Sequence, residues 1–225
     1  MLGRTASNLF WISRFMERAE NMARMLDVGY RVSLTPSLDS GHREQWESTL
    51  RAAGIAEGFA ERFQTAEVAQ ICDFMLFDSD NAASVYSCLS SARNNARAVR
   101  TAITSEMWES INTTWLEFSN IKPSRDITGD IPRLVDWVKR NTAQFRGTML
   151  NTLLRTDGYS FSQLGAFIER ADNTARILDV KYYVLLPRAE LVGSNLDMSQ
   201  WSTILRAASA HRSYKHAYRD RFKAW

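Results

Sequence analysis

The sequence contains few residues of the types that interrupt helices or build metal and disulfide sites. Its 225 residues include ten glycines, four prolines, two cysteines and three histidines. Because Gly and Pro are the strongest breakers of regular structure, their scarcity favours a helical protein. Cys72 and Cys88 lack a partner at metal-ligand spacing, so we expect two buried, reduced thiols. No histidine lies three residues after a glutamate, which excludes paired Glu-x-x-His motifs, and we expect no metal and no cofactor.

Long apolar runs and a strong charge of one sign are also missing. No stretch approaches the roughly 18 apolar residues of a membrane span, and the N-terminus lacks the features of a signal peptide. We therefore expect a cytoplasmic protein that does not bind membranes. The 28 basic and 25 acidic residues nearly balance, which does not favour a polyanionic partner. Only the stretch from Arg206 to Lys223 is basic and aromatic; a nucleic-acid interface there is the lesser alternative to a solvated helix face.

Apolar residues recur with helical spacing along the whole chain, and no stretch alternates as a strand does. The sequence predicts an all-α bundle of about eight helices. We expect Ser79 or Asp80, and Ser105, as N-caps, and Pro132 in a first helical turn. The expected helices cover residues 6–34, 42–63, 67–77, 79–103, 105–121, 131–155, 159–186 and 198–222.

One twelve-residue segment occurs twice. The segment ERAENMARMLDV at 17–28 returns as ERADNTARILDV at 169–180, 152 positions later. Beyond it, QWESTLRAA at 45–53 matches QWSTILRAA at 200–208. The chain therefore contains an internal duplication. We assign residues 1–155 to the first copy and 156–225 to the start of a second, incomplete copy, packed together as one globular unit.

The duplication preserves charged residues as well as apolar ones. On a helix, the repeated Glu, Asn and Arg side chains share a stripe opposite the apolar face. Two interpretations remain open: a polar seam between two pseudo-symmetric helices, in which Glu17 meets Arg176 or Asn173 and Glu169 meets Arg24 or Asn21, or a binding site for a ligand or partner. The candidate residues are Glu17, Arg18, Asn21, Arg24, Glu169, Arg170, Asn173 and Arg176.

An incomplete second copy has a consequence for its apolar surface. The helix that carries Trp201, Leu205 and Ala208 would lack the cover that segments 71–77 and 85–89 give its counterpart in the first copy. We expect an apolar patch there that makes the chain dimerise, exchange helices with a second copy or aggregate; a homo-oligomer is one of these outcomes.

Three stretches of the chain resemble the Alpha-E family of all-helical bacterial proteins, and the resemblance covers essentially the whole chain. They are MLGRTASNLFWISRFMERAENMARMLDV, FMLFDSDNAASVYSCL and GAFIERADNTARILDV. The resemblance implies association with circularly permuted ATP-grasp ligases, often beside transglutaminase-like proteins, in systems that form or process peptide or amide bonds. It supplies no catalytic residue to carry over.

The chain cannot be the ligase itself, because it lacks a glycine-rich phosphate-binding motif and the strands of that fold. Two functions remain. The chain is either a non-catalytic binding or scaffold subunit that works with an ATP-grasp ligase, or an enzyme that acts on a peptide-like substrate through the duplicated Glu/Asn/Arg stripe.

Overall fold

The computed structural model describes residues 1–34, 41–121, 127–183 and 193–219. Within these ranges the side chains at positions 32, 41–45, 179–183 and 196 are not described. The described residues form ten α-helices and no strand, which confirms the all-α prediction. The helices are α1 (Gly3–Ser33), α2 (Gly41–Ala52), α3 (Ala56–Ala60), α4 (Val68–Leu76), α5 (Val85–Ala98), α6 (Ser105–Ser119), α7 (Ile127–Thr152), α8 (Asp157–Tyr183), α9 (Asn195–Ala207) and α10 (His211–Tyr218).

The described residues contain ten helices instead of the expected eight, because two of the expected helices are each divided into two. The helix expected over 42–63 is divided into α2 and α3, and the one expected over 198–222 into α9 and α10. The remaining helices begin and end within a few residues of the predicted positions, except at both ends of α5 and at the start of α7. The expected stops at Pro36 and Pro187 lie outside the described residues.

The three predictions about helix starts were wrong in detail. Helix α5 begins later than expected, with Ser84 as its N-cap accepting from the backbone N–H of Ser87 at 3.0 Å. The preceding residues form turns in which Asp78 and Asn81 side chains accept backbone N–H groups, an arrangement that competes with helix formation. Thr104, one residue before the expected cap, accepts from the N–H of Met107 at 3.2 Å.

Helix α7 starts before Pro132 rather than at it. Its first residue, Ile127, is buried at 6% exposure, and Pro132 lies inside the helix. Burial of an apolar residue one turn ahead of the proline offsets the backbone hydrogen bond that proline cannot donate.

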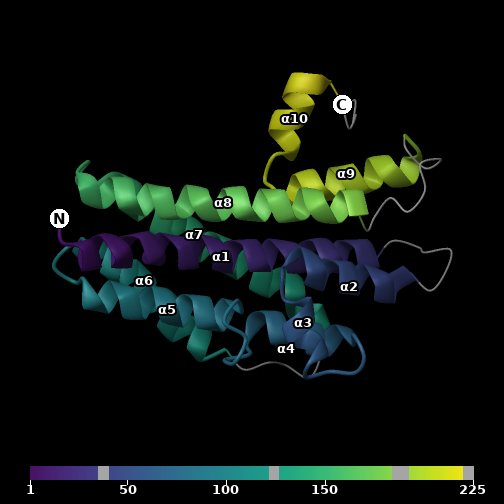
Figure 1. The fold of residues 1–225 in the computed structure, drawn as a ribbon, viewed down its shortest axis with the longest axis horizontal. Helices are drawn as coiled ribbons and strands as arrows, with labels where there is room; N and C mark the ends of the chain where they lie inside the picture. The colour runs from purple at the N-terminus through teal and green to yellow at the C-terminus, as the bar shows by residue number, and fades with distance from the viewer. Residues whose placement is uncertain (35–40, 122–126, 184–192, 220–225) are drawn as a thin grey trace. The chain divides into compact units, whose positions relative to one another are not determined.

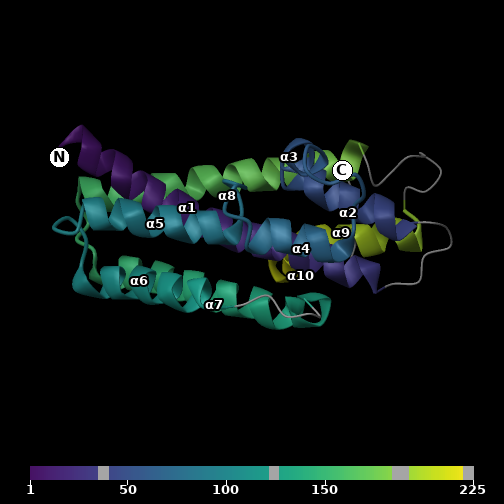
Figure 2. The same ribbon diagram turned by 90° about the horizontal axis from the view of Figure 1, so that it is seen from below.

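Residues 1–23 and 68–171 form one compact unit, here called unit 1. It contains the first part of α1, helices α4 to α7 and the first part of α8. Helix α6 packs against both α5 and α7, and α4 packs against α7 and α5 (Figures 1 and 2). Its core is aliphatic and aromatic, with side chains at most 2% exposed that include Leu9, Ile12, Met16, Ile71, Met75, Leu89, Ile111, Phe118, Val138 and Phe145.

Residues 24–67 and 172–225 form the second compact unit, unit 2. Within it α2 contacts α3, and α9 contacts α10. Helix α1 approaches α2 closely, because a Cβ atom at Gly29 would lie 2.7 Å from the ring of Trp46. Trp46 is buried, whereas its repeat counterpart Trp201 and the neighbouring Leu205 are half-buried. The two units cut across the two sequence copies, since each unit takes residues from both.

The break between α2 and α3 and the break between α9 and α10 are formed by the same type of turn, which occurs once in each copy. In the first copy the N–H groups of Gly54 and Ile55 donate to the carbonyls of Arg51 and Leu50 at 2.9 and 3.0 Å. In the second copy Ser209 and Ala210 donate to Arg206 and Leu205 at 3.1 and 2.8 Å. This pair of bonds defines a Schellman motif, which needs a left-handed residue after the helix.

The left-handed position is filled differently in the two copies. Gly54 has φ +69°, which glycine adopts without steric cost, but Ser209 has φ +58° and carries a side chain. The break therefore belongs to the duplicated architecture and does not depend on glycine.

Replacing Ser209 with Gly should stabilise the protein by about 1 kcal/mol, because it relieves the left-handed strain of a non-glycine residue. Urea unfolding measures the change. Ala208→Gly is the matched control: this neighbour has φ −74°, so glycine there should destabilise. A loss of stability in Ser209→Gly would contradict the assignment of the motif.

Candidate functional site

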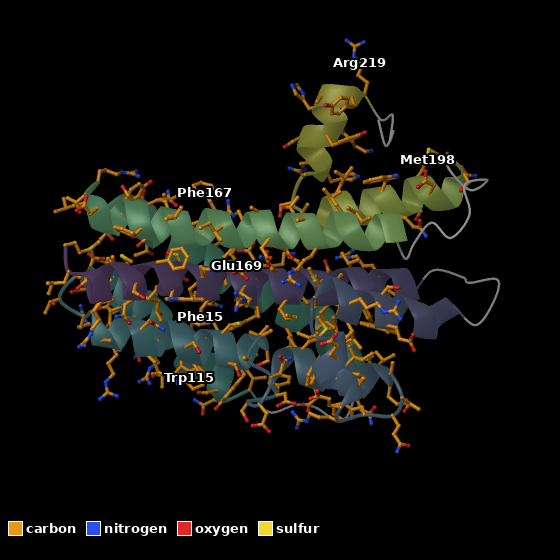
Figure 3. The ribbon with its side chains drawn as sticks, viewed as in Figure 1. Phe15, Trp115, Phe167, Glu169, Met198 and Arg219 are labelled. Atoms are coloured by element: carbon orange, nitrogen blue, oxygen red, sulfur yellow. The ribbon has the colours of Figure 1, made fainter. Side chains whose placement is uncertain are left out.

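The first halves of α1 and α8 run side by side in the same direction within unit 1. Gly165 lies against the backbone of Phe10, so closely that a Cβ atom at position 165 would overlap the Phe10 carbonyl oxygen. Further along, Arg14 and Arg18 of α1 reach Glu169 of α8. Residues early in one helix thus meet residues early in the other, and later residues meet later ones. Figure 3 shows Glu169 between the two helices.

The two Glu-Arg dipeptides of the repeat bind each other crosswise. Arg18 donates from Nε and Nη2 to the two carboxylate oxygens of Glu169, at 2.6 and 2.9 Å. Arg170 donates from the same two nitrogens to the two oxygens of Glu17, at 2.6 and 3.2 Å. Glu17 and Arg18 are the repeat counterparts of Glu169 and Arg170. Exchanging the two copies therefore turns one ion pair into the other, as two-fold symmetry does in an isologous interface.

Further side chains complete the coordination of these carboxylates. Arg14 donates from Nε to Glu169 at 2.7 Å. Arg146 of α7 donates to Glu17 at 3.0 Å and also binds Glu20. The Thr142 hydroxyl, one turn before Arg146, donates to Glu20 at 2.9 Å. We call this cluster the ER seam; its residues are Arg14, Glu17, Arg18, Glu20, Thr142, Arg146, Glu169 and Arg170.

Burial makes the ER seam energetically important. Glu17, Glu20 and Glu169 are 6%, 4% and 4% exposed. A carboxylate taken out of water needs charged donors, and bidentate arginine is the donor that fits it best. Burial by itself lowers the pKa of Arg146, but the carboxylates of Glu20 and Glu17 raise it above its ordinary value. Four arginines and three glutamates meet here, so the described members of the seam carry one net positive charge.

Unit 1 also places a thiol beside the ER seam. Burial raises the pKa of Cys88 from 9.0 to about 12, while the nearby Arg18 guanidinium lowers it and the Glu169 carboxylate raises it. Burial and the neighbouring Asp73 raise the pKa of Cys72 to about 12. Both thiols are fully buried and stay protonated near neutral pH, a state in which sulfur is a poor nucleophile.

The structure corrects the expected partners of the two repeated glutamates. Glu17 binds Arg170 and Arg146, in place of Arg176 or Asn173. Glu169 binds Arg18 and Arg14, in place of Arg24 or Asn21. The arginine directly after each glutamate supplies the cross-pair because the two helices are parallel with almost no offset.

The other four candidate residues lie outside this pairing. Asn21, at the end of unit 1, is buried, and its Nδ2 atom has no hydrogen-bond partner among the described residues. Asn173, buried, and Arg24, half-exposed, belong to unit 2. In that unit Arg176 donates from Nε to Asp172, four residues earlier on the same helix, at 2.9 Å, and its guanidinium lies over Gly54.

The sequence analysis missed four further members of the seam: Arg14, Glu20, Thr142 and Arg146. Glu20 lies inside the repeated segment, where its counterpart is Asp172, but it is not among the candidate residues. Arg14 has no charged counterpart in the second copy, where Ala166 stands, so the repeat does not point to it. Thr142 and Arg146 lie on α7, outside the repeated segment. Within the described residues no group of three or more His, Cys, Asp or Glu side chains is arranged to hold a metal ion. None of the helices in the described ranges has the length and apolar character needed to cross a membrane.

Together, the fold and the ER seam define an all-helical protein in which two copies of one helix are locked by reciprocal Glu-Arg pairs. Residues 1–225 match the model of the Alpha-E family, described as a predicted alpha-helical domain with a conserved ER motif. The chain belongs to the Alpha-E family. No curated protein and no solved structure compared with the chain matches it. The sequence contains ER in both halves of the seam and once more at Glu61-Arg62, which is exposed in unit 2.

Both halves of the seam should contribute similarly to stability. In double-mutant cycles with Arg→Met and Glu→Gln, the pairs Arg18–Glu169 and Arg170–Glu17 should each show a coupling energy of about 1–3 kcal/mol in urea unfolding. The matched control is the exposed pair Arg176–Asp172, for which we expect about 0.5 kcal/mol or less. Seam couplings no larger than the control would contradict a buried, stabilising network.

The close approach of α8 to α1 should depend on Gly165. Gly165→Ala should destabilise by about 1–3 kcal/mol, because the added methyl group meets backbone that cannot move cheaply. The control is Gly147→Ala in α7, where an added Cβ meets nothing within 4 Å and the better helix propensity of alanine should stabilise by up to about 1 kcal/mol. Thermal unfolding of both variants measures the contrast, and equal effects would contradict the close approach of Gly165 to the Phe10 backbone.

Proposed function

We propose that this Alpha-E chain is a non-catalytic binding or scaffold subunit that works with an ATP-grasp ligase in forming peptide or amide bonds. The observation that carries the non-catalytic part is the ER seam. Its three carboxylates are buried, and each one is bound by at least one guanidinium. A general base needs a lone pair within reach of a substrate proton, and carboxylates bound in this way serve instead to join helices.

The choice of partner is supported by membership of the family. The resemblance to Alpha-E proteins implies association with circularly permuted ATP-grasp ligases, often next to transglutaminase-like proteins. Such a ligase brings its own nucleotide and metal sites. The helical chain would then contribute binding surface, or position the ligase and its substrate.

The test is direct binding and turnover with an ATP-grasp ligase from the same source. The chain should co-purify with the ligase and change its rate of ATP consumption, and it should turn over neither ATP nor a peptide-like substrate by itself. Turnover of a peptide-like substrate by the chain without the ligase would favour the enzyme alternative. Failure to bind any such ligase and to alter its rate would overturn the proposal.

A variant of the seam separates the two alternatives. Glu169→Gln removes a seam charge, and the control Glu117→Gln removes an exposed charge on α6. For a scaffold, binding of the ligase by Glu169→Gln should fall only in proportion to its folded fraction, measured by circular dichroism. For an enzyme, Glu169→Gln should lose turnover while remaining folded. Glu117→Gln should match the parent chain in both measurements.

A further inference from the structure

Helix α8 has an exposed apolar face within unit 1. Phe167 points away from α1, on the outer side of α8, as Figure 3 shows. Exposed apolar side chains are normal when they are isolated, but the exposed apolar side chains of α8 follow helical spacing and form one strip. The strip, here called the α8 face, consists of Phe161 (39% exposed), Leu164 (47%), Phe167 (57%) and Ile168 (40%).

The sequence repeat shows what kind of surface the α8 face is. Its four counterparts in α1 are Leu9, Ile12, Phe15 and Met16. Leu9, Ile12 and Met16 are 1%, 1% and 2% exposed and belong to the core of unit 1. Figure 3 shows Phe15 on the side of α1 that faces α5. The same positions of one duplicated helix are therefore core in one copy and surface in the other.

We infer that a second copy of this chain binds the α8 face, with the two α8 helices packed antiparallel around a two-fold axis at Leu164. In this register Leu164 meets Leu164 of the second copy, and Phe161 meets Phe167 of the second copy. A two-fold contact needs a self-complementary surface, and this strip is apolar with a large side chain at each of its ends.

The charges at the ends of the face select the antiparallel arrangement. Asp157, 76% exposed, lies one turn before Phe161 on the same side of α8, and its carboxylate is 3.9 Å from the N-terminal ammonium group of Met1. Antiparallel packing brings Asp157 next to Ala171 and Arg170 of the second copy. Arg170 binds Glu17 of its own chain, but its side chain is 41% exposed, so its positive charge also faces the solvent side of α8. Parallel packing would place Asp157 opposite Asp157, which costs free energy when the surrounding surface is apolar.

The size of the face sets the strength of the dimer. With large apolar side chains of about 150–250 Å² each, the four exposed fractions amount to several hundred Å² per chain. A stable interface of standard size buries about 800 Å² per partner. The dimer should therefore be weak, and its population should rise with protein concentration over the micromolar range.

Sedimentation equilibrium of the full chain tests the inference. The chain should be a concentration-dependent dimer, and Leu164→Glu should shift it to monomer. Leu116→Glu on α6 is the matched control, since Leu116 is 46% exposed and lies outside the α8 face; this variant should dimerise like the parent chain. A parent chain that stays monomeric up to its solubility limit overturns the inference, as does a dimer that Leu164→Glu leaves intact.

Introduced cysteines test the register. Cys72 and Cys88 are buried, so an added surface cysteine is the reactive thiol among the described residues. Under mild oxidation Leu164→Cys should form a disulfide with itself, and a mixture of Phe161→Cys with Phe167→Cys should form the mixed dimer. Phe161→Cys linking mainly to itself would overturn the antiparallel register. If the chain is monomeric and Leu164→Glu instead abolishes ligase binding, the α8 face belongs to the ligase and the second copy is excluded.

Discussion

The crosswise ion pairing of two Glu-Arg dipeptides is the interaction on which unit 1 depends. A buried carboxylate without a donor is costly, so each glutamate requires the arginine of the other copy to be in place. Because Glu17 binds Arg170 while Arg18 binds Glu169, the two helices are held both in direction and in register. Loss of either dipeptide removes one of the two arginines that bind the glutamate of the other copy, which gives a physical reason for an ER motif to persist in a family of helical proteins.

The two copies make corresponding contacts at the ER seam and different contacts elsewhere. Ser13 of α1 contacts Met149 through its hydroxyl group. Its counterpart in α8 is Gly165, which lies against the Phe10 backbone. The turn after the second repeated helix has Gly54 in one copy and Ser209 in the other, with the same hydrogen bonds. The apolar face that forms core in α1 is exposed in α8. Corresponding helices and corresponding turn hydrogen bonds thus occur in different surroundings in the two copies.

Most of the fold could be predicted from sequence, because amphipathic periodicity and the repeat are local signals. The helix breaks at Gly54 and Ser209 were missed, since a Schellman turn interrupts a helix without interrupting its apolar spacing. The repeat identified Glu17, Arg18, Glu169 and Arg170 as a group but gave no direction for one helix against the other. Without that direction, Asn173 and Arg176 were equally reasonable partners for Glu17. The role of Arg146 as a partner of Glu17 could not be predicted from the repeat, because its helix, α7, is not duplicated.

Nuclear magnetic resonance of the arginine Nε–H groups tests the crosswise pairing most directly. Glu17→Gln should shift the Nε–H resonance of Arg170 and leave that of Arg18 nearly unchanged, because the donor to Glu17 lies on the other helix. Glu169→Gln should do the reverse. If Glu17→Gln instead shifts its neighbour Arg18 and leaves Arg170 unchanged, the glutamates are not paired across the two copies and the ER seam does not exist as described.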